Sequence, residues 1–204
     1  MLSRWIRTWD RRLLEPFLSF IARLGITANA LTIASLCTVI IAGICLALGK
    51  TILAAWILLF GGFLDGIDGE LARVSGLKSP FGAFLDSICD HFGDFAIYLG
   101  LLWLYLKSNA FIEIILIFVA LFTSVFGSHV RSRAGMVGID TKSIGIFTRA
   151  ERIFLLFFCI LFSKVSIALW GLAIFNSFSA LQRVIYTIGV FRKDENTLQN
   201  QETL

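Results

Sequence analysis

Long apolar runs separated by short polar segments dominate the chain from residue 30 onward. A helix needs about 20 mainly apolar residues to cross a bilayer, and most of these runs reach that length. The runs are residues 30–49, 52–74, 81–106, 109–130, 146–163 and 165–190. The pattern predicts an all-α integral membrane protein with a bundle of six transmembrane helices. The fifth run is short and follows "TRAER", so its first turns are expected in a polar setting.

The two ends of the chain have other patterns. In residues 1–26 apolar side chains recur at helical spacing and arginines fill the opposite face, which predicts an amphipathic helix lying in the membrane interface. Residues 192–204 are polar and predict a disordered tail. Residues 1–191 are therefore expected to form one membrane domain, with its spans at about 30–190.

Composition and charge agree with a membrane location. The chain is 57% hydrophobic with a mean hydropathy of +0.84, whereas soluble domains are about 45–50% apolar. Six spans would place all but three of the 18 basic residues on the side of both termini, the exceptions being Lys50, Lys107 and Lys164. The positive-inside rule predicts that this side is cytoplasmic, in a multi-pass protein of the inner, cytoplasmic membrane. The basic residues lie at span ends, which argues against nucleic-acid binding.

Five aspartates interrupt the second and third apolar runs. They are Asp65, Asp68, Asp86, Asp90 and Asp94. Each would cost roughly 2.5–3.5 kcal/mol in the middle of a membrane helix, so they must face a shared polar cavity with compensating charge. The first two are three residues apart and the others four apart, so each set lies on one helix face. The connection "VSGLKSP" is short, which brings the two faces together, and Ser79 and Pro80 fit the start of the third span.

Crowded carboxylates repel one another unless cations bridge them. A ligand set of oxygens alone suits Mg²⁺ or Mn²⁺ rather than Zn²⁺, and no histidine or cysteine lies at ligand spacing. The pattern predicts a site for two divalent cations, which could clamp phosphate groups. One alternative is a cation transporter lined by aspartates, but these residues gather toward one end of their spans. A scaffold without activity is another alternative.

The spacing of these residues resembles the signature of the CDP-alcohol phosphotransferase family. The matching segment runs Asp65-x-x-Asp68-Gly69-x-x-Ala72-Arg73, then eight residues, then Gly82-x-x-x-Asp86-x-x-x-Asp90. Every fixed position of the signature is present. Two positions outside the signature depart from common family patterns. Ala28 stands where proline is frequent before the first span, and His91 stands where Lys or Arg often follows the last aspartate.

The resemblance implies a metal-dependent phosphatidyltransferase of phospholipid biosynthesis that binds a CDP-lipid such as CDP-diacylglycerol. A small polar alcohol would attack the lipid-side phosphate, and CMP would leave. The implied metal ligands are Asp65, Asp68, Asp86 and Asp90, with Asp90 also the general base. The implied nucleotide-binding residues are Asp68, Gly69, Ala72, Arg73 and Gly82. Family members commonly form homodimers. Asp94 lies outside the signature, and a structural pairing with a basic residue stays open for it.

A second group of basic residues suggests an acceptor with its own phosphate, because arginine can bind phosphate bidentately. The candidates are Arg131, Arg133, Lys142, Arg149, Arg152 and Arg183. The strings "HVRSRA", "GIFTRAER" and "LQRV" are similar to the phosphatidylinositol phosphate synthase branch, which implies inositol phosphate as the acceptor. Glycerol 3-phosphate, giving phosphatidylglycerol phosphate, is the alternative within the family. The positive-inside rule alone could also explain these residues.

Overall fold

The computed structural model describes residues 16, 18–22, 24–141 and 144–202, and this part of the chain contains no strand. The predicted all-α fold is confirmed. The helices are α3 (Ala28–Ala47), α4 (Thr51–Val74), α5 (Pro80–Leu106), α6 (Phe111–Met136), α7 (Arg149–Leu161) and α8 (Val165–Glu202). Each predicted span corresponds to one helix, but α6 and α8 continue beyond the predicted ends and α7 is shorter than its run.

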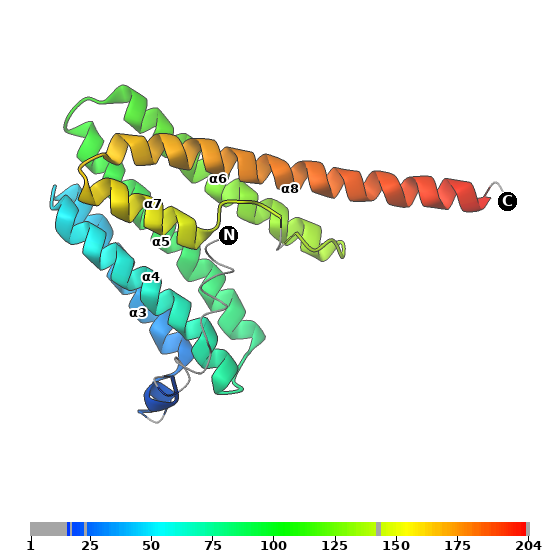
Figure 1. Cartoon of the computed structure of the whole chain (residues 1–204), viewed down its shortest axis with the longest axis horizontal. Coiled ribbons are helices and arrows are strands. Elements are labelled where there is room, and N and C mark those ends of the chain that lie inside the picture. Colours follow the sequence, from blue (N-terminus) through cyan, green and yellow to red (C-terminus); the bar gives the residue numbers. More distant parts are fainter. Residues whose placement is uncertain (1–15, 17, 23, 142–143, 203–204) are drawn as a thin grey trace.

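The helices pack as a ring. Their contacts run from α3 to α4, α7, α8, α6, α5 and back to α3. Figure 1 shows the axes of α3, α4 and α5 aligned with one another and those of α6 and α8 inclined to them, with α7 between the two groups. The two groups are close at the end where α7 meets α8 and diverge toward the other end.

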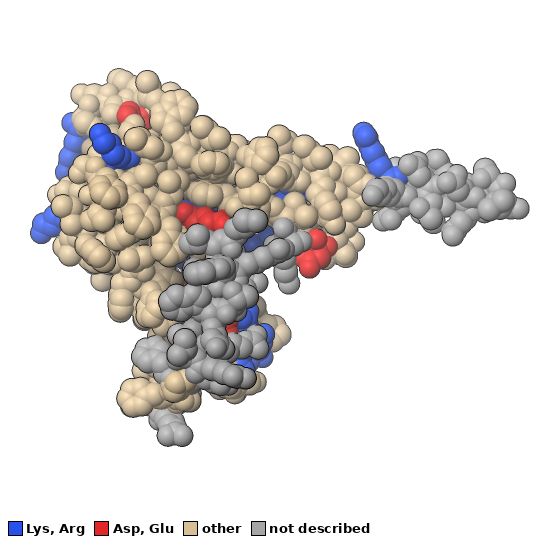
Figure 2. Space-filling model, viewed as in Figure 1, with Lys and Arg blue, Asp and Glu red and all other residues tan. Residues whose placement is uncertain are grey.

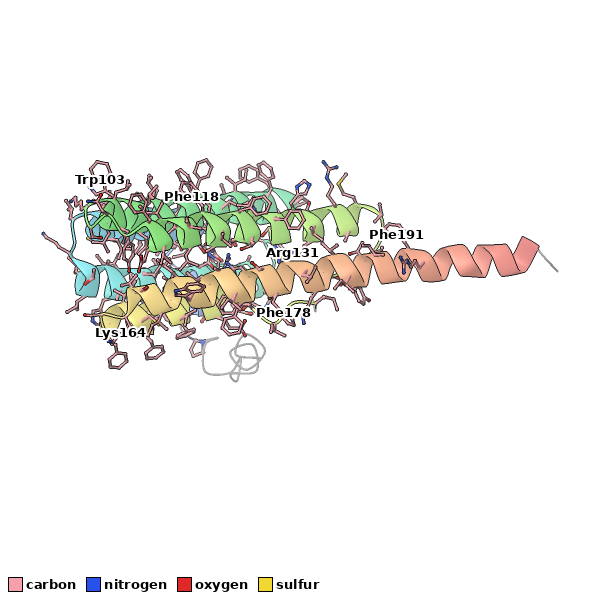
Figure 3. The ribbon with its side chains drawn as sticks, turned by 90° about the horizontal axis from the view of Figure 1, so that it is seen from above. Trp103, Phe118, Arg131, Lys164, Phe178 and Phe191 are labelled. Atoms are coloured by element: carbon pink, nitrogen blue, oxygen red, sulfur yellow. The ribbon has the colours of Figure 1, made fainter. Side chains whose placement is uncertain are left out.

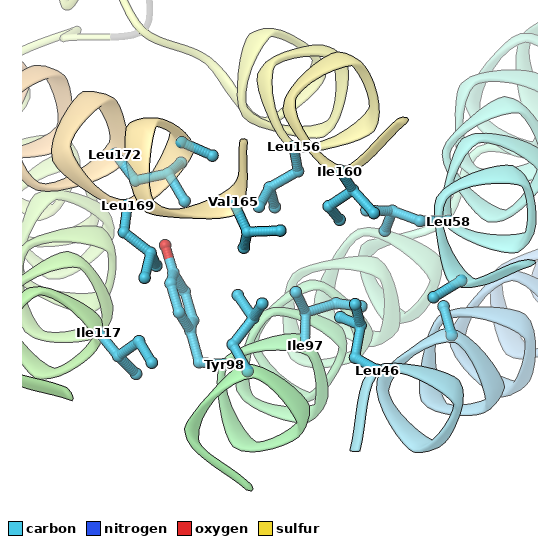
Figure 4. Packing of buried hydrophobic residues seen from close by; sticks show 14 of the residues in the cluster. Leu46, Leu58, Ile97, Tyr98, Ile117, Leu156, Ile160, Val165, Leu169 and Leu172 are labelled. Atoms are coloured by element: carbon cyan, nitrogen blue, oxygen red, sulfur yellow. The ribbon is translucent and has the colours of Figure 1, made fainter. Parts of the chain in front are cut away.

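Apolar side chains fill the centre of the ring. Tyr98, Ile97, Leu156 and Leu169 are buried there, and Figure 4 shows side chains from the surrounding helices meeting around Tyr98. Helices α3 and α5 approach each other closely at Gly43 and Gly100. A Cβ atom added at Gly100 would lie 2.2 Å from the carbonyl oxygen of Gly43. Glycine at this point lets the two backbones touch, as small residues do at helix contacts in membranes.

Large apolar side chains are exposed on the outer surface of the ring, as expected for contact with lipid. Trp103, Phe118 and Phe178 are each about half exposed and point away from the bundle in Figure 3. Four helices, α3, α4, α6 and the Val165–Arg192 part of α8, are long and apolar enough to cross a membrane. α5 has 27 residues but carries three aspartates, and α7 has only 13 residues. The protein is thus a helical membrane protein, and the count of six spans stays a prediction.

The two ends of the chain were predicted to form an interfacial helix and a disordered tail. Most of the predicted interfacial helix, residues 1–15, 17 and 23, lies outside the described residues. Residues 18–22 are helical, and Leu18 is buried against Ile67 and Leu71 of α4. At the other end the backbone of α8 stays helical through Glu202, where the sequence predicted a disordered tail from residue 192. The sixth span was predicted to end at residue 190 because the apolar run ends there, whereas the last turns of α8 are polar.

Candidate active site

The α4–α5 hairpin places the aspartates. Ser79 begins α5, its hydroxyl accepting a hydrogen bond from the backbone N–H of Gly82 at 3.0 Å, and Pro80 follows in the first turn. Both helix-start predictions are confirmed. The short connection between Val74 and Pro80 makes α4 and α5 antiparallel, and both helices pack against α3. The aspartates near the end of α4 and the start of α5 therefore lie at one end of the ring.

Three carboxylates meet at this end. Asp65 and Asp68 of α4 and Asp86 of α5 each offer an oxygen, and these oxygens all lie within 4.8 Å of one another. Asp68 is buried, whereas the other two are more exposed. In Figure 2 charged side chains are few on the face in view and form small separate groups on an otherwise uncharged surface. The predicted convergence of these three residues is confirmed by the structure.

A hydroxyl of α3 contacts the buried member of the cluster. Thr32 donates a hydrogen bond from Oγ1 to Oδ2 of Asp68 at 2.5 Å. Both side chains are almost fully buried, with exposed fractions of 4% for Thr32 and 5% for Asp68. A buried charge requires such a partner, because leaving it without one costs much free energy. Thr32 was not among the predicted site residues, since nothing in its apolar sequence surroundings marks it.

Arg149 lies between the cluster and the fourth predicted ligand. Its Nη1 atom contacts Asp65 Oδ1 at 2.6 Å and also forms an ion pair with Asp90. Gly93 leaves room for this side chain: a Cβ atom there would lie 3.3 Å from Arg149 Nη2. Asp90 is thus tied to the other carboxylates through an arginine at the first turn of α7. The polar setting predicted for the start of this helix is confirmed.

One turn deeper, a second ion pair joins the same two helices. Arg152 of α7 contacts Asp94 Oδ2 of α5 at 2.9 Å, and Ser124 of α6 donates a hydrogen bond to the same oxygen at 3.0 Å. Arg152 also donates to the Ser124 hydroxyl. The interpretation that Asp94 pairs with a basic residue is therefore confirmed. The network ties three helices of the ring together, and Asp94, Arg149 and Arg152 line one pocket.

The predicted nucleotide-binding residues lie on α4 and α5, the two helices that carry the cluster. A Cβ atom at Gly69 would meet nothing within 4 Å, so the surface of α4 is bare there. Gly82 faces the side chain of Asn29 on α3. Arg73 is partly exposed and forms an ion pair with Glu70. A bare helix surface beside carboxylates leaves space for a ligand to approach the backbone.

The predicted acceptor residues fall into different environments. Arg131 and Arg133 are exposed at the end of α6, and Lys142 lies outside the described residues. Arg183 of α8 donates hydrogen bonds to two backbone carbonyls, Ile144 at 3.1 Å and Gly127 at 2.9 Å. Arg131 and Arg152 both interact electrostatically with Arg183, so positive charges of α6, α7 and α8 lie near one another. The structure therefore groups most of these basic residues at the same end of the ring as the aspartates.

The cluster fits a hard divalent cation. Its ligand atoms are carboxylate oxygens, and no histidine or cysteine joins the group in the described part of the chain. Oxygen-only sites of this kind suit Mg²⁺ and Mn²⁺. Asp68 supports this fit, because a buried carboxylate beside two others needs positive charge nearby.

Comparison with known proteins identifies the family. The model of the CDP-alcohol phosphatidyltransferase family matches residues 25–189. The archaetidylinositol phosphate synthase of Pyrococcus horikoshii is 38% identical over 184 residues, which cover 90% of this chain and 95% of that protein.

Crystal structures of the phosphatidylinositol phosphate synthase of Mycobacterium tuberculosis have the same fold. The structure with CDP-DAG bound has a TM-score of 0.78 and 26% identity and covers 86% of this chain and 94% of that one. A second structure, in complex with manganese and citrate, has a TM-score of 0.76 and 26% identity and covers 84% of this chain and 87% of that one. With three of the signature aspartates gathered at one site, the chain belongs to the CDP-alcohol phosphatidyltransferase family.

Proposed function

We propose that this enzyme transfers a phosphatidyl-type group from CDP-diacylglycerol to an inositol phosphate and releases CMP. The observation that carries the proposal is the convergence of Asp65, Asp68 and Asp86 within 4.8 Å. The likeness to inositol phosphate-type synthases, one of which has been solved with CDP-DAG bound, supports the choice of donor and acceptor.

The acidic cluster would hold two divalent cations through Asp65, Asp68, Asp86 and Asp90. When bound, such cations neutralise a diphosphate and stabilise the charge on the leaving phosphate. Together with Arg149 they would more than offset the four carboxylates, so the site would attract an anionic donor. Both Mg²⁺ and Mn²⁺ satisfy this chemistry.

The residues beside the cluster have separate roles in the proposal. Gly69, Ala72 and Gly82 are small and would let the nucleotide approach the backbones of α4 and α5. Arg73 would supply a positive charge beside it. Asp90 accepts the proton of the acceptor hydroxyl on a carboxylate oxygen. That hydroxyl oxygen forms a bond to the lipid-side phosphorus while the bond to the CMP oxygen breaks. Arg149 holds the Asp90 carboxylate at the edge of the cluster.

The arginines favour an acceptor that carries a phosphate. Arg131 interacts electrostatically with Asp86 and with Arg183. An alcohol with a phosphate could reach the cluster with its hydroxyl and the arginines with its phosphate. Arg133, which is also exposed at the end of α6, would add positive charge to the same region, and Lys142 stays a candidate from the sequence alone.

Release of CMP from CDP-diacylglycerol tests the proposal directly. The purified chain should release CMP only with Mg²⁺ or Mn²⁺ and with inositol phosphate present. Parallel reactions with glycerol 3-phosphate and with unphosphorylated inositol identify the acceptor. No CMP release with any of them would contradict the enzyme function, and release only with glycerol 3-phosphate would change the acceptor.

A pair of variants connects this activity to the site. Asp90→Asn should lose turnover by at least about 100-fold, the scale of a lost general base, while donor binding is largely kept. Glu113→Gln is the matched control, because Glu113 lies in the first turn of α6 and bonds Ser166 at the start of α8, at the opposite end of the ring. Equal activity of the two variants would remove Asp90 from the role of base.

The location and assembly follow from the same proposal. Both termini and the site would face the cytoplasm, because the basic residues gather at that end of the spans. Residues 1–191 would form one membrane domain, with the interfacial helix included. A homodimer is expected from the family. Cysteine labelling from each side of the membrane and the mass of the detergent-solubilised protein test these points.

A further inference from the structure

We propose that Thr32 is a positioning residue for the cations of the acidic cluster. Its hydroxyl orients the carboxylate of Asp68 and thereby sets the affinity of the site for Mn²⁺ or Mg²⁺. The inference rests on the proposed metal-binding role of Asp65, Asp68 and Asp86, and it adds a residue of α3 that lies outside the signature.

The geometry distinguishes this hydroxyl from an ordinary helix contact. Thr32 Oγ1 lies 2.5 Å from Asp68 Oδ2 and 3.1 Å from the carbonyl oxygen of Ala28 one turn earlier. A hydroxyl has a single proton to donate, and the shorter distance assigns that proton to Asp68. Threonines in helices usually bond the preceding turn, so Thr32 is diverted to the carboxylate.

The surroundings hold Thr32 in register with Asp68. Thr27 caps the start of α3 by accepting a hydrogen bond from the N–H of Ala30 at 3.2 Å. Leu31, the residue before Thr32, packs on Ile67 and Leu71, which flank Asp68 on α4. The part of α3 that carries the Thr32 hydroxyl is thus held in place by a cap at its start and by packing on α4. This is the arrangement by which outer partners orient metal ligands.

Ser35 offers a matched control on the same helix face. It is buried three residues further along α3 and donates a hydrogen bond to the carbonyl oxygen of Gly61 at 2.9 Å. Its bond joins the same two helices, but its acceptor is a backbone carbonyl about two helical turns before Asp68 on α4. A purely structural role for Thr32 would make loss of the two hydroxyls equivalent.

The test is a titration of the purified full-length chain with Mn²⁺ in detergent, without donor or acceptor, monitored by the electron paramagnetic resonance of free Mn²⁺. Thr32→Val should raise the Mn²⁺ dissociation constant about 10–100-fold, the range for lost outer partners of metal ligands. Thr32→Ser, which keeps the donor, and Ser35→Ala should stay within about two-fold of the unsubstituted chain. If Thr32→Val does not fold, Thr32→Cys replaces it, since a thiol is a weak donor and should shift the constant in the same direction.

The outcomes separate this inference from the proposed function. Saturable Mn²⁺ binding that Asp68→Asn abolishes and Thr32→Val leaves unchanged would overturn the role of Thr32 alone. Equal weakening by Thr32→Val and Ser35→Ala would overturn it too, because helix packing would then explain the loss. If the unsubstituted chain binds no Mn²⁺, the metal site of the proposed function fails, and the inference falls with it.

Discussion

Replacing Asp94 by asparagine should destabilise the protein far more than removing an exposed acidic residue. Asp94 pairs with Arg152 at 2.9 Å, and both side chains are mostly buried, with exposed fractions of 18% and 16%. The substitution keeps the shape and a hydrogen-bond acceptor for Ser124 but removes the charge. Arg152 would then remain charged without its partner inside the ring.

The expected magnitude follows from the distance. At 2.9 Å and an effective dielectric constant of about 20, the Coulomb attraction is about 6 kcal/mol. Removing the carboxylate also removes its desolvation cost, which offsets part of this loss. Breaking a buried pair costs about 3–5 kcal/mol in practice, and asparagine can still accept a bond, so we expect about 3 kcal/mol. For a chain of this size that lowers the apparent Tm by roughly 6–12 °C.

Thermal unfolding of the purified chain in detergent measures this loss. Glu70→Gln is the control, because its partner Arg73 is 39% exposed and such pairs contribute at most about 1 kcal/mol. Arg152→Gln and the double variant complete a double-mutant cycle, in which the double variant should be more stable than the sum of the single losses predicts.

Two results would refute the reasoning. One is a shift for Asp94→Asn no larger than that of Glu70→Gln, which would mean that solvent screens the pair as it does at the surface. The other is strict additivity in the cycle, which would mean that Asp94 and Arg152 do not stabilise each other.

Further predictions concern the helix crossing, the loop before α7 and the cations. Gly100→Ala should cost about 1–3 kcal/mol, because its Cβ would collide with the carbonyl of Gly43, whereas Gly189→Ala meets nothing and should be neutral or slightly stabilising in the same thermal unfolding assay. Arg183→Ala should raise the acceptor KM more than the donor KM and also lower the Tm, since Ile144 loses its hydrogen-bond donor; equal changes in both KM values would exclude a selective acceptor role. EDTA should abolish CMP release, and Mg²⁺ or Mn²⁺ but not Zn²⁺ should restore it; activity that persists in EDTA would refute the metal dependence.

Much of the fold and the acidic cluster could be predicted because they depend on periodicity. The apolar runs place the helices, and the spacing of Asp65 and Asp68 puts them on one face whatever their neighbours. A short connection then makes α4 and α5 antiparallel. These steps need only the geometry of a helix and the length of a loop.

The partners of the aspartates could not be predicted, because they come from residues distant in sequence. Thr32 is 36 residues from Asp68, and Arg149 is 84 residues from Asp65. Nothing in the local pattern indicates which face of α3 or which turn of α7 meets the cluster. The continuation of α8 beyond the predicted span was likewise not foreseen, since a polar helix that leaves the apolar region has no hydrophobic pattern to mark it.

The shortness of α7 has a consequence for where a lipid can react. Thirteen residues span about 20 Å, whereas the hydrocarbon layer is about 30 Å thick. If α7 is the fifth span, as the sequence predicts, its first residue, Arg149, would fall roughly 10 Å short of the opposite boundary of that layer. The non-helical chain leading into α7 would then lie at that depth, where Arg183 and Ser179 form hydrogen bonds with its backbone, as a polar main chain within a bilayer requires. To reach the carboxylates, the diphosphate of a lipid would therefore have to lie below the headgroups of the neighbouring lipids. Such a lipid would enter the site laterally from the bilayer, with its acyl chains still in the surrounding leaflet.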